Sequence, residues 1–178
     1  MTENDIISWS KQSFLNWTDF KAEHNASIFE DSHSTIKYGF TWTVNSDKED
    51  GKIVFLIENI LLSVEFHPLL SSVRESCKND NLLKHEQGHF DLAELVKNEK
   101  LEEFYKKFYN QKFPTRGQNE EQRKQFAKED SGKMIASEIE KLFEILNKRR
   151  EEYDELTNFG ENQEKQKEFD LFFNELHK

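Results

Sequence analysis

The chain contains one cysteine, two prolines and six glycines among its 178 residues, and each shortage excludes something. A single cysteine, Cys77, cannot form an internal disulfide, and we expect it to be a buried, unreactive thiol. With so little proline and glycine, no linker divides the chain, so we expect one domain spanning residues 1–178. No apolar run approaches the roughly 18 residues that a membrane-spanning helix needs.

Positive charge is also scarce, because 25 Lys and Arg face 35 Asp and Glu and leave a net charge of −10. An acidic chain repels phosphate groups, so neither nucleic acid nor an anionic membrane surface is an expected partner. The first residues, Met1–Asp5, are polar and lack the apolar core of a signal peptide. This end of the sequence therefore predicts either a cytoplasmic protein or a mature form without its signal.

Alternating apolar residues predict a β-rich part over residues 1–70. In Thr35–Asn45 and again in Lys52–His67, apolar side chains occupy every second position, and a polar cluster at Ser46–Gly51 separates the two segments. They predict an antiparallel hairpin with a break in the alternation near Glu58–Asn59. Two shorter predictions are a loop or short strand at Trp17–Phe20 and the end of the sheet at Pro68.

Residues 71–178 predict a helical part with three helices. The first begins near Asn79 or Asp80, either of which can cap it, and runs to about Lys112. The second covers about Asn119–Leu156 and the last Glu161–His177, because apolar residues recur at three- and four-residue steps. The fold class expected from both parts is α+β, a small antiparallel sheet packed against long helices.

The first predicted helix carries one motif that indicates a chemistry. Residues 85–89 read His-Glu-Gln-Gly-His, the HExxH pattern. Positions i and i+4 lie on one face a turn apart, so His85 and His89 can direct two imidazoles at one metal ion. Glu86 can then reach a water at the metal and take its proton. Two histidine ligands with a glutamate base are typical of zinc peptidases, whereas the alternative is a pair of core histidines with other partners.

Three segments together resemble a bacterial family of predicted secreted zinc-dependent proteases, otherwise catalogued as a domain of unknown function. The run Leu82–Leu95, with His-Glu-Gln-Gly-His-Phe-Asp at its centre, resembles the family's central motif. Leu15–Lys21 resembles its opening Leu-x-Trp-x-Asp-Phe, and Tyr153–Gly160 resembles its Tyr-Asp-x-x-Thr-x-His-Gly, which a Gln-rich helix follows. The resemblance implies a secreted or periplasmic zinc peptidase. It fails at Phe159, which stands where the family has a histidine able to act as a third ligand.

Catalytic zinc needs three protein ligands and one open position, so a third ligand must be sought. Asp91 lies about 200° round the helix from His89, and Glu94 about 180° from His85, so we expect neither carboxylate to bind the metal. Asp91 is expected instead to orient a histidine or to accept a backbone amide.

The remaining candidates lie outside this helix. Asp154 and Glu155 precede Phe159 and are chemically able ligands, although a solvated end of a helix accounts for both equally well. Tyr153 is either an oxyanion donor or, as we expect, a core residue. Four further histidines are candidates that we expect at the surface: His24, His33, His67 and His177.

The function predicted from these observations is a zinc-dependent metallopeptidase with a zincin-like active-site helix and a peptide or protein substrate. His85 and His89 would bind the metal and Glu86 would act as the general base. One alternative is a catalytically degenerate zincin-like binding protein that has lost its third ligand at Phe159. Another is a helical interaction protein without metal. Bound zinc would exclude the second alternative, and hydrolysis would exclude the first.

Overall fold

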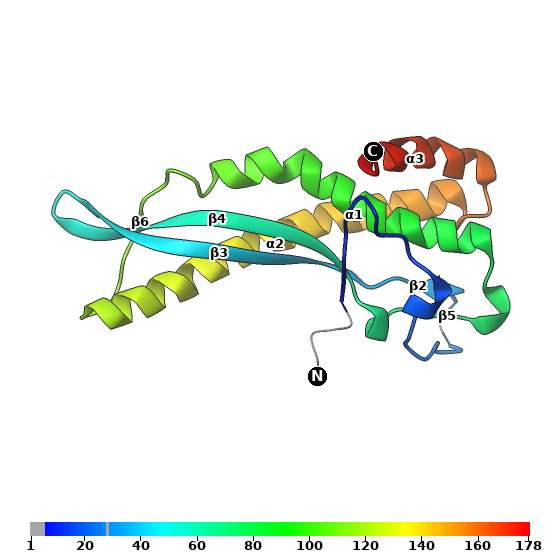
Figure 1. The fold of residues 1–178 in the computed structure, drawn as a ribbon, viewed down its shortest axis with the longest axis horizontal. Helices are drawn as coiled ribbons and strands as arrows, with labels where there is room; N and C mark the ends of the chain where they lie inside the picture. The colour runs from blue at the N-terminus through cyan, green and yellow to red at the C-terminus, as the bar shows by residue number, and fades with distance from the viewer. Residues whose placement is uncertain (1–5, 28) are drawn as a thin grey trace.

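The computed structural model describes residues 6–27 and 29–178 and confirms the α+β class, with strands first and helices after them (Figure 1). The main sheet has the order β1-β4-β3, and β6 pairs with the start of β4. Its strands are β1 (Ile7–Ser8), β3 (Ile36–Glu49), β4 (Lys52–Phe66) and β6 (Phe113–Pro114). A second, two-stranded sheet pairs β2 (Ser32–His33) with β5 (Ser72–Val73). The helices are α1 (Asp80–Lys106), α2 (Glu120–Thr157) and α3 (Gln163–Leu176).

The long antiparallel hairpin of β3 and β4 is as predicted, except at its turn. The strands pair from Ile36 with Phe66 down to Glu49 with Lys52, so the expected turn over residues 46–51 was too wide. Only Asp50 and Gly51 connect them, both with positive φ (49° and 77°). Asp-Gly is well suited to such a two-residue turn, which matches the twist of the strands and keeps them paired to their ends.

The predicted break in β4 is confirmed as a β-bulge. Between the pairs Thr41–Leu61 and Thr43–Glu58, β4 contains one residue more than β3, and Asn59 has a φ of 51°. The extra residue shifts the alternation, because side chains of a strand change face at every residue. The most deeply buried positions are accordingly odd-numbered before the bulge (Phe55, Ile57) and even-numbered after it (Ile60, Val64, Phe66), although Val54 is buried as well.

The helices begin where asparagines cap them, and the first ends earlier than predicted. Asn79, Asn119 and Asn162 each accept a hydrogen bond from a backbone amide in the first turn of α1, α2 and α3. Helix α1 stops at Lys106 rather than near residue 112, and the chain returns to the sheet as β6. There Phe113 packs against Phe55, with ring centroids 5.4 Å apart. Packing of this aromatic pair is therefore favoured over a continuation of α1 to residue 112.

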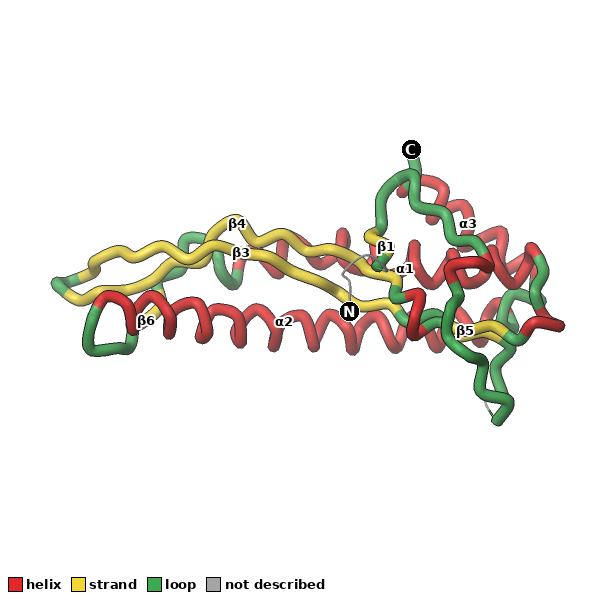
Figure 2. Tube along the Cα trace, turned by 60° about the horizontal axis from the view of Figure 1, so that its bottom comes forward, coloured by secondary structure: helices red, strands yellow, loops and turns green. Residues whose placement is uncertain are grey.

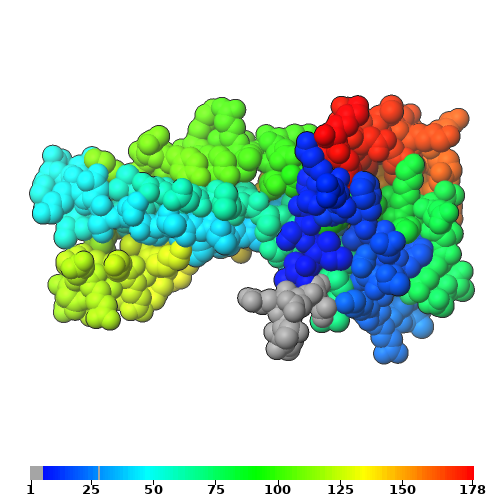
Figure 3. Space-filling view, viewed as in Figure 1, coloured from blue at the N-terminus to red at the C-terminus, as the bar shows by residue number. Residues whose placement is uncertain are grey.

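The elements form two regions along one axis (Figures 1 and 2). The hairpin, the C-terminal half of α1 and the N-terminal half of α2 make a narrow region, which Figure 3 shows beside a broader one. Its core includes Phe55, Ile57, Phe104 and Ile135. The broader region packs α3, the start of α1 and the end of α2 with the N-terminal segment around Phe66, Phe90, Leu146, Tyr153 and Phe173. None of the helices in the described part of the chain is long and apolar enough to cross a membrane.

Two shorter predictions need correction. Trp17–Asp19 forms a 3-10 helix rather than the expected loop or short strand, because Asn16 and Asp19 bond reciprocally across its first turn. Pro68 ends β4 as predicted, but pairing does not stop there, since β5 follows as a partner for β2. This small second sheet carries residues 32–34 to the first turns of α1.

Candidate metal centre

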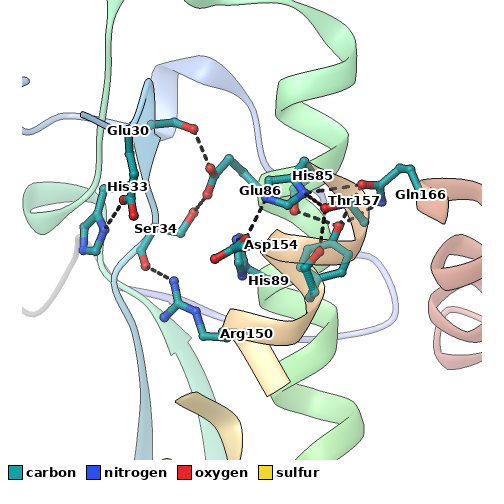
Figure 4. Close-up of polar contacts among 12 residues, drawn as sticks. Glu30, His33, Ser34, His85, Glu86, His89, Arg150, Asp154, Thr157 and Gln166 are labelled. Carbon is teal, nitrogen blue, oxygen red and sulfur yellow. Dashed lines mark hydrogen bonds and ion pairs between the residues drawn. The ribbon is translucent and has the colours of Figure 1, made fainter. Parts of the chain in front are cut away.

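The two motif histidines and one aspartate meet where α1 crosses the end of α2 (Figure 4). His85 and His89 are buried, and Asp154 is partly buried. The Nε2 atoms of His85 and His89 lie 3.0 Å and 2.9 Å from the same oxygen, Oδ1 of Asp154. One ligand atom from each residue lies within 4.8 Å of the other two, so this group could hold a metal ion.

The tautomer of His85 follows from its two neighbours at Nδ1. Thr157 Oγ1, 3.3 Å away, has its own hydrogen engaged with the Tyr153 carbonyl oxygen, so towards His85 it can only accept. Gln166 donates its amide hydrogens to the Tyr153 hydroxyl and to Asp170, which turns its carbonyl oxygen towards His85 Nδ1 at 3.4 Å. Both neighbours are acceptors, and the hydrogen of a neutral His85 therefore sits on Nδ1.

A cation between His85 and Asp154 would remove the repulsion between two acceptors that this tautomer creates. With its hydrogen on Nδ1, neutral His85 presents the lone pair of Nε2 to the Asp154 oxygen, so two acceptors face each other at 3.0 Å. Either a proton or a metal ion must lie between them. Two imidazole nitrogens and a carboxylate oxygen form a donor set that Zn²⁺ accepts, so the residues present fit this metal.

The protonation states of His89 and Asp154 also suit metal binding. Burial lowers the pKa of His89, which favours the neutral imidazole that metals bind. For Asp154, burial raises the pKa, but positive charge shared with the two histidines at its Oδ1 lowers the pKa by more in sum, so the carboxylate is ionised. Nδ1 of His89 is buried and has no hydrogen-bond partner among the described residues.

Two glycines allow close packing around His85: Gly88 within α1, and Gly160 in the turn after α2. A side chain at Gly88 would overlap the Tyr153 hydroxyl, which donates to the His85 or Gln166 carbonyl oxygen. Tyr153 stacks on the His85 ring, with centroids 4.6 Å apart and planes at 8°. It is fully buried, as expected of a core residue, and does not line the groove, so it is no oxyanion donor. At Gly160, a Cβ would lie 2.8 Å from His85 Cβ.

Glu86 is held by a segment that the sequence analysis did not connect with the motif. Its two carboxylate oxygens accept hydrogen bonds from the Ser32 and Ser34 hydroxyls, the first at 2.5 Å, and all three side chains are buried (Figure 4). Arg150, one turn before Asp154 on α2, donates to the Ser34 carbonyl oxygen at 3.0 Å. The β2 segment thus orients Glu86, and α2 in turn anchors that segment.

The candidate metal centre lies in a groove of about 1560 Å³. Residues within 26–34, 74–89 and 147–161 line it, and Glu86, Arg150 and all three candidate ligands are among them. Its volume exceeds the roughly 300–1,000 Å³ of small-molecule pockets, so its size favours an extended ligand.

Replacing Ser34 with alanine is expected to lower the free energy of unfolding by about 1.5–3 kcal/mol, because a buried carboxylate oxygen loses a hydrogen bond. Urea unfolding of the single variant measures this loss. The same substitution in a Glu86→Gln background is the control, since a neutral amide depends less on the serine. Equal losses in both backgrounds would mean that Ser34 stabilises the fold without acting on Glu86.

The other candidate ligands lie away from the centre. Asp91 accepts from Trp9 and Gln87 and contacts His177, rather than a motif histidine, at 2.9 Å, and Glu94 pairs with Lys97 at 2.7 Å. Among the described residues, neither belongs to a group able to hold a metal. Exposed Glu155 and four further histidines also lie outside such a group: His24, His33, His67 and His177.

Sequence reasoning named Asp154 as a candidate but left it level with Glu155, and it did not find the other partners. Ser32, Ser34 and Arg150 carried no signal, because serines in a polar loop and an arginine in a charged helix are ordinary. Thr157 and Gln166 lie in the C-terminal segment singled out by the family resemblance, so that segment was the one available hint. Its Phe159 is exposed at the rim of the groove, and Asp154 rather than Phe159 meets the histidines.

Comparison with protein-family models, with curated proteins and with solved structures finds no match for this chain.

Proposed function

We propose that this protein is a zinc-dependent metallopeptidase, with His85, His89 and Asp154 as the metal ligands and Glu86 as the general base. The observation that carries the proposal is the convergence of two imidazole Nε2 atoms on one carboxylate oxygen, at 3.0 Å and 2.9 Å, in an open groove. With Asp154 as third ligand, the phenylalanine at position 159 does not by itself remove the site.

Each residue of the candidate site then has a chemical role. A zinc ion bound there would supply a Lewis acid that polarises the scissile carbonyl and activates water near neutral pH. Glu86, oriented by Ser32 and Ser34, takes a proton from the attacking water and delivers it to the leaving amine. Arg150 has further N–H groups beyond the one on Ser34 and lines the groove, where it can donate to a developing oxyanion.

A peptide is the substrate that the groove favours. Three separate chain segments line the groove together with the candidate ligands, and its volume suits a peptide chain better than a compact metabolite. The family resemblance agrees with a peptide substrate, and on that resemblance alone the proposal places the protein outside the cytoplasm.

Protein purified without chelator is expected to contain about one zinc per chain, and zinc added to chelator-treated protein should raise the melting temperature. Elemental analysis and thermal unfolding measure the two effects, and casein is a suitable first substrate. Absence of metal together with no thermal shift would reject the site and favour a metal-free interaction protein. Tight zinc binding without hydrolysis of casein or of a peptide library would favour the degenerate binding protein.

A further inference from the structure

Phe159 has a backbone conformation that its side chain disfavours. Its φ is 53°, in the left-handed region, and Asn158 before it has a φ of 47°. Asparagine tolerates this region, but a phenylalanine there costs roughly 1–2 kcal/mol. Burial does not offset the cost, because Phe159 is 46% exposed. A strained residue whose side chain does not stabilise the core is a candidate for a role in binding.

The position of Phe159 relative to the candidate ligands is set by short contacts. Its amide donates to the carbonyl oxygen of Asp154 at 3.0 Å. The next residue, Gly160, lies so close to His85 that a Cβ there would be 2.8 Å from the His85 Cβ. The turn that presents Phe159 is therefore braced against two of the three residues of the candidate metal centre.

Two more apolar side chains line the same groove. Phe29, in the loop before β2, is 96% exposed, which is unusual for a phenylalanine. Leu82, on the first turn of α1 and one turn before Glu86, is half-buried. Three chain segments thus bring large apolar groups to a groove whose other lining includes the charged and polar groups of the centre.

We propose that Phe159 forms a subsite for a bulky apolar side chain of an extended peptide bound across the candidate metal centre, in the groove that Leu82 and Phe29 also line. The inference rests on the proposed peptidase function and adds the class of residue that it selects. The strained backbone keeps the Phe159 side chain facing the groove. Burial of this side chain against a bound peptide then supplies the apolar contact that it lacks in the free protein. The residue that replaces the family's histidine is accordingly a substrate contact.

The test measures peptide binding without turnover, in the full zinc-loaded chain carrying Glu86→Gln. Two fluorescent hexapeptides, identical except for Phe or Ser at a central position, are titrated while anisotropy is followed. The Phe peptide is expected to bind about tenfold more tightly, as burial of a large apolar side chain implies. Adding Phe159→Asn should bring this ratio close to one. Asparagine suits the left-handed backbone, so the melting temperature should stay equal or rise.

Phe172→Asn is the matched control, because Phe172 is 63% exposed on α3 and does not line the groove. It should leave the ratio at about tenfold. An unchanged ratio in the Phe159→Asn protein would overturn the subsite while leaving the peptidase proposal intact. If zinc is bound but neither peptide is, the peptidase proposal itself fails and the subsite with it. A dimer in sedimentation that Phe159→Asn converts to monomer would also overturn the subsite, since the apolar rim would then be a self-association surface.

Discussion

Asp154→Ala is expected to weaken zinc binding by roughly 100-fold or more. Zinc held by four ligands gains about 10–16 kcal/mol, so each ligand contributes on the order of 3 kcal/mol, and loss of one leaves only the two histidines. Asp154 Oδ1 is the atom on which the Nε2 atoms of His85 and His89 converge. Titration against a competing chelator of known affinity measures the change, with His89→Ala as the reference for the loss of one ligand.

Glu155→Ala is the matched control for this prediction. Glu155 is the next residue on α2 and an exposed carboxylate, so its removal changes the net charge equally without touching the centre. Zinc affinity should stay within about twofold of the natural chain, because a screened surface charge contributes little. Equal effects of the two substitutions would mean that Asp154 acts through general electrostatics and is not a ligand.

Glu86→Gln is expected to reduce peptide hydrolysis by roughly 10²–10⁴-fold, because the amide cannot accept a proton from water. Zinc affinity should change little, since the three ligand atoms belong to other residues. The fold should also survive, because glutamine can still accept a hydrogen bond from Ser32 or Ser34 at its carbonyl oxygen. Zinc content and the initial rate of peptide cleavage are measured on the same preparation.

Glu94→Gln serves as the control for this prediction because Glu94 is a second buried glutamate on α1, outside the centre and paired with Lys97. It should retain full activity in protein that remains folded. Hydrolysis that survives Glu86→Gln undiminished would remove Glu86 as the base, and either another group or a contaminating peptidase would then have to be sought.

Features that depend on local periodicity were predictable from the sequence. Three- and four-residue spacing placed His85 and His89 together on one face of α1, and it placed Asp91 and Glu94 on other faces of the helix, which are buried as well. The change of alternation near Asn59 predicted a break, which the structure shows to be a bulge, and Asn79 was one of two expected caps of α1. Each of these is determined within a few residues, by backbone geometry and by which side chains avoid water.

Packing between helices decided which carboxylate joins the two histidines. Asp154 and Glu155 are both carboxylates and adjacent, but they point about 100° apart round α2. Which of them meets α1 depends on the rotation of α2, and the Tyr153 ring, lodged against Gly88 and stacked on His85, sets that rotation. No local pattern encodes it, because the contact joins residues far apart in the chain.

The sequence by itself determined an α+β chain, two histidines on one face of a helix that could bind a metal, and a glutamate beside them. Tertiary structure alone selected Asp154 and brought Ser32 and Ser34 to Glu86. It also placed Phe159, which the sequence had indicated as a lost ligand, among the residues that line the groove. The physical reason is that amphipathic periodicity reports which face of an element is buried, whereas a site needs atoms from several elements within hydrogen-bonding distance, and only their packing sets those distances.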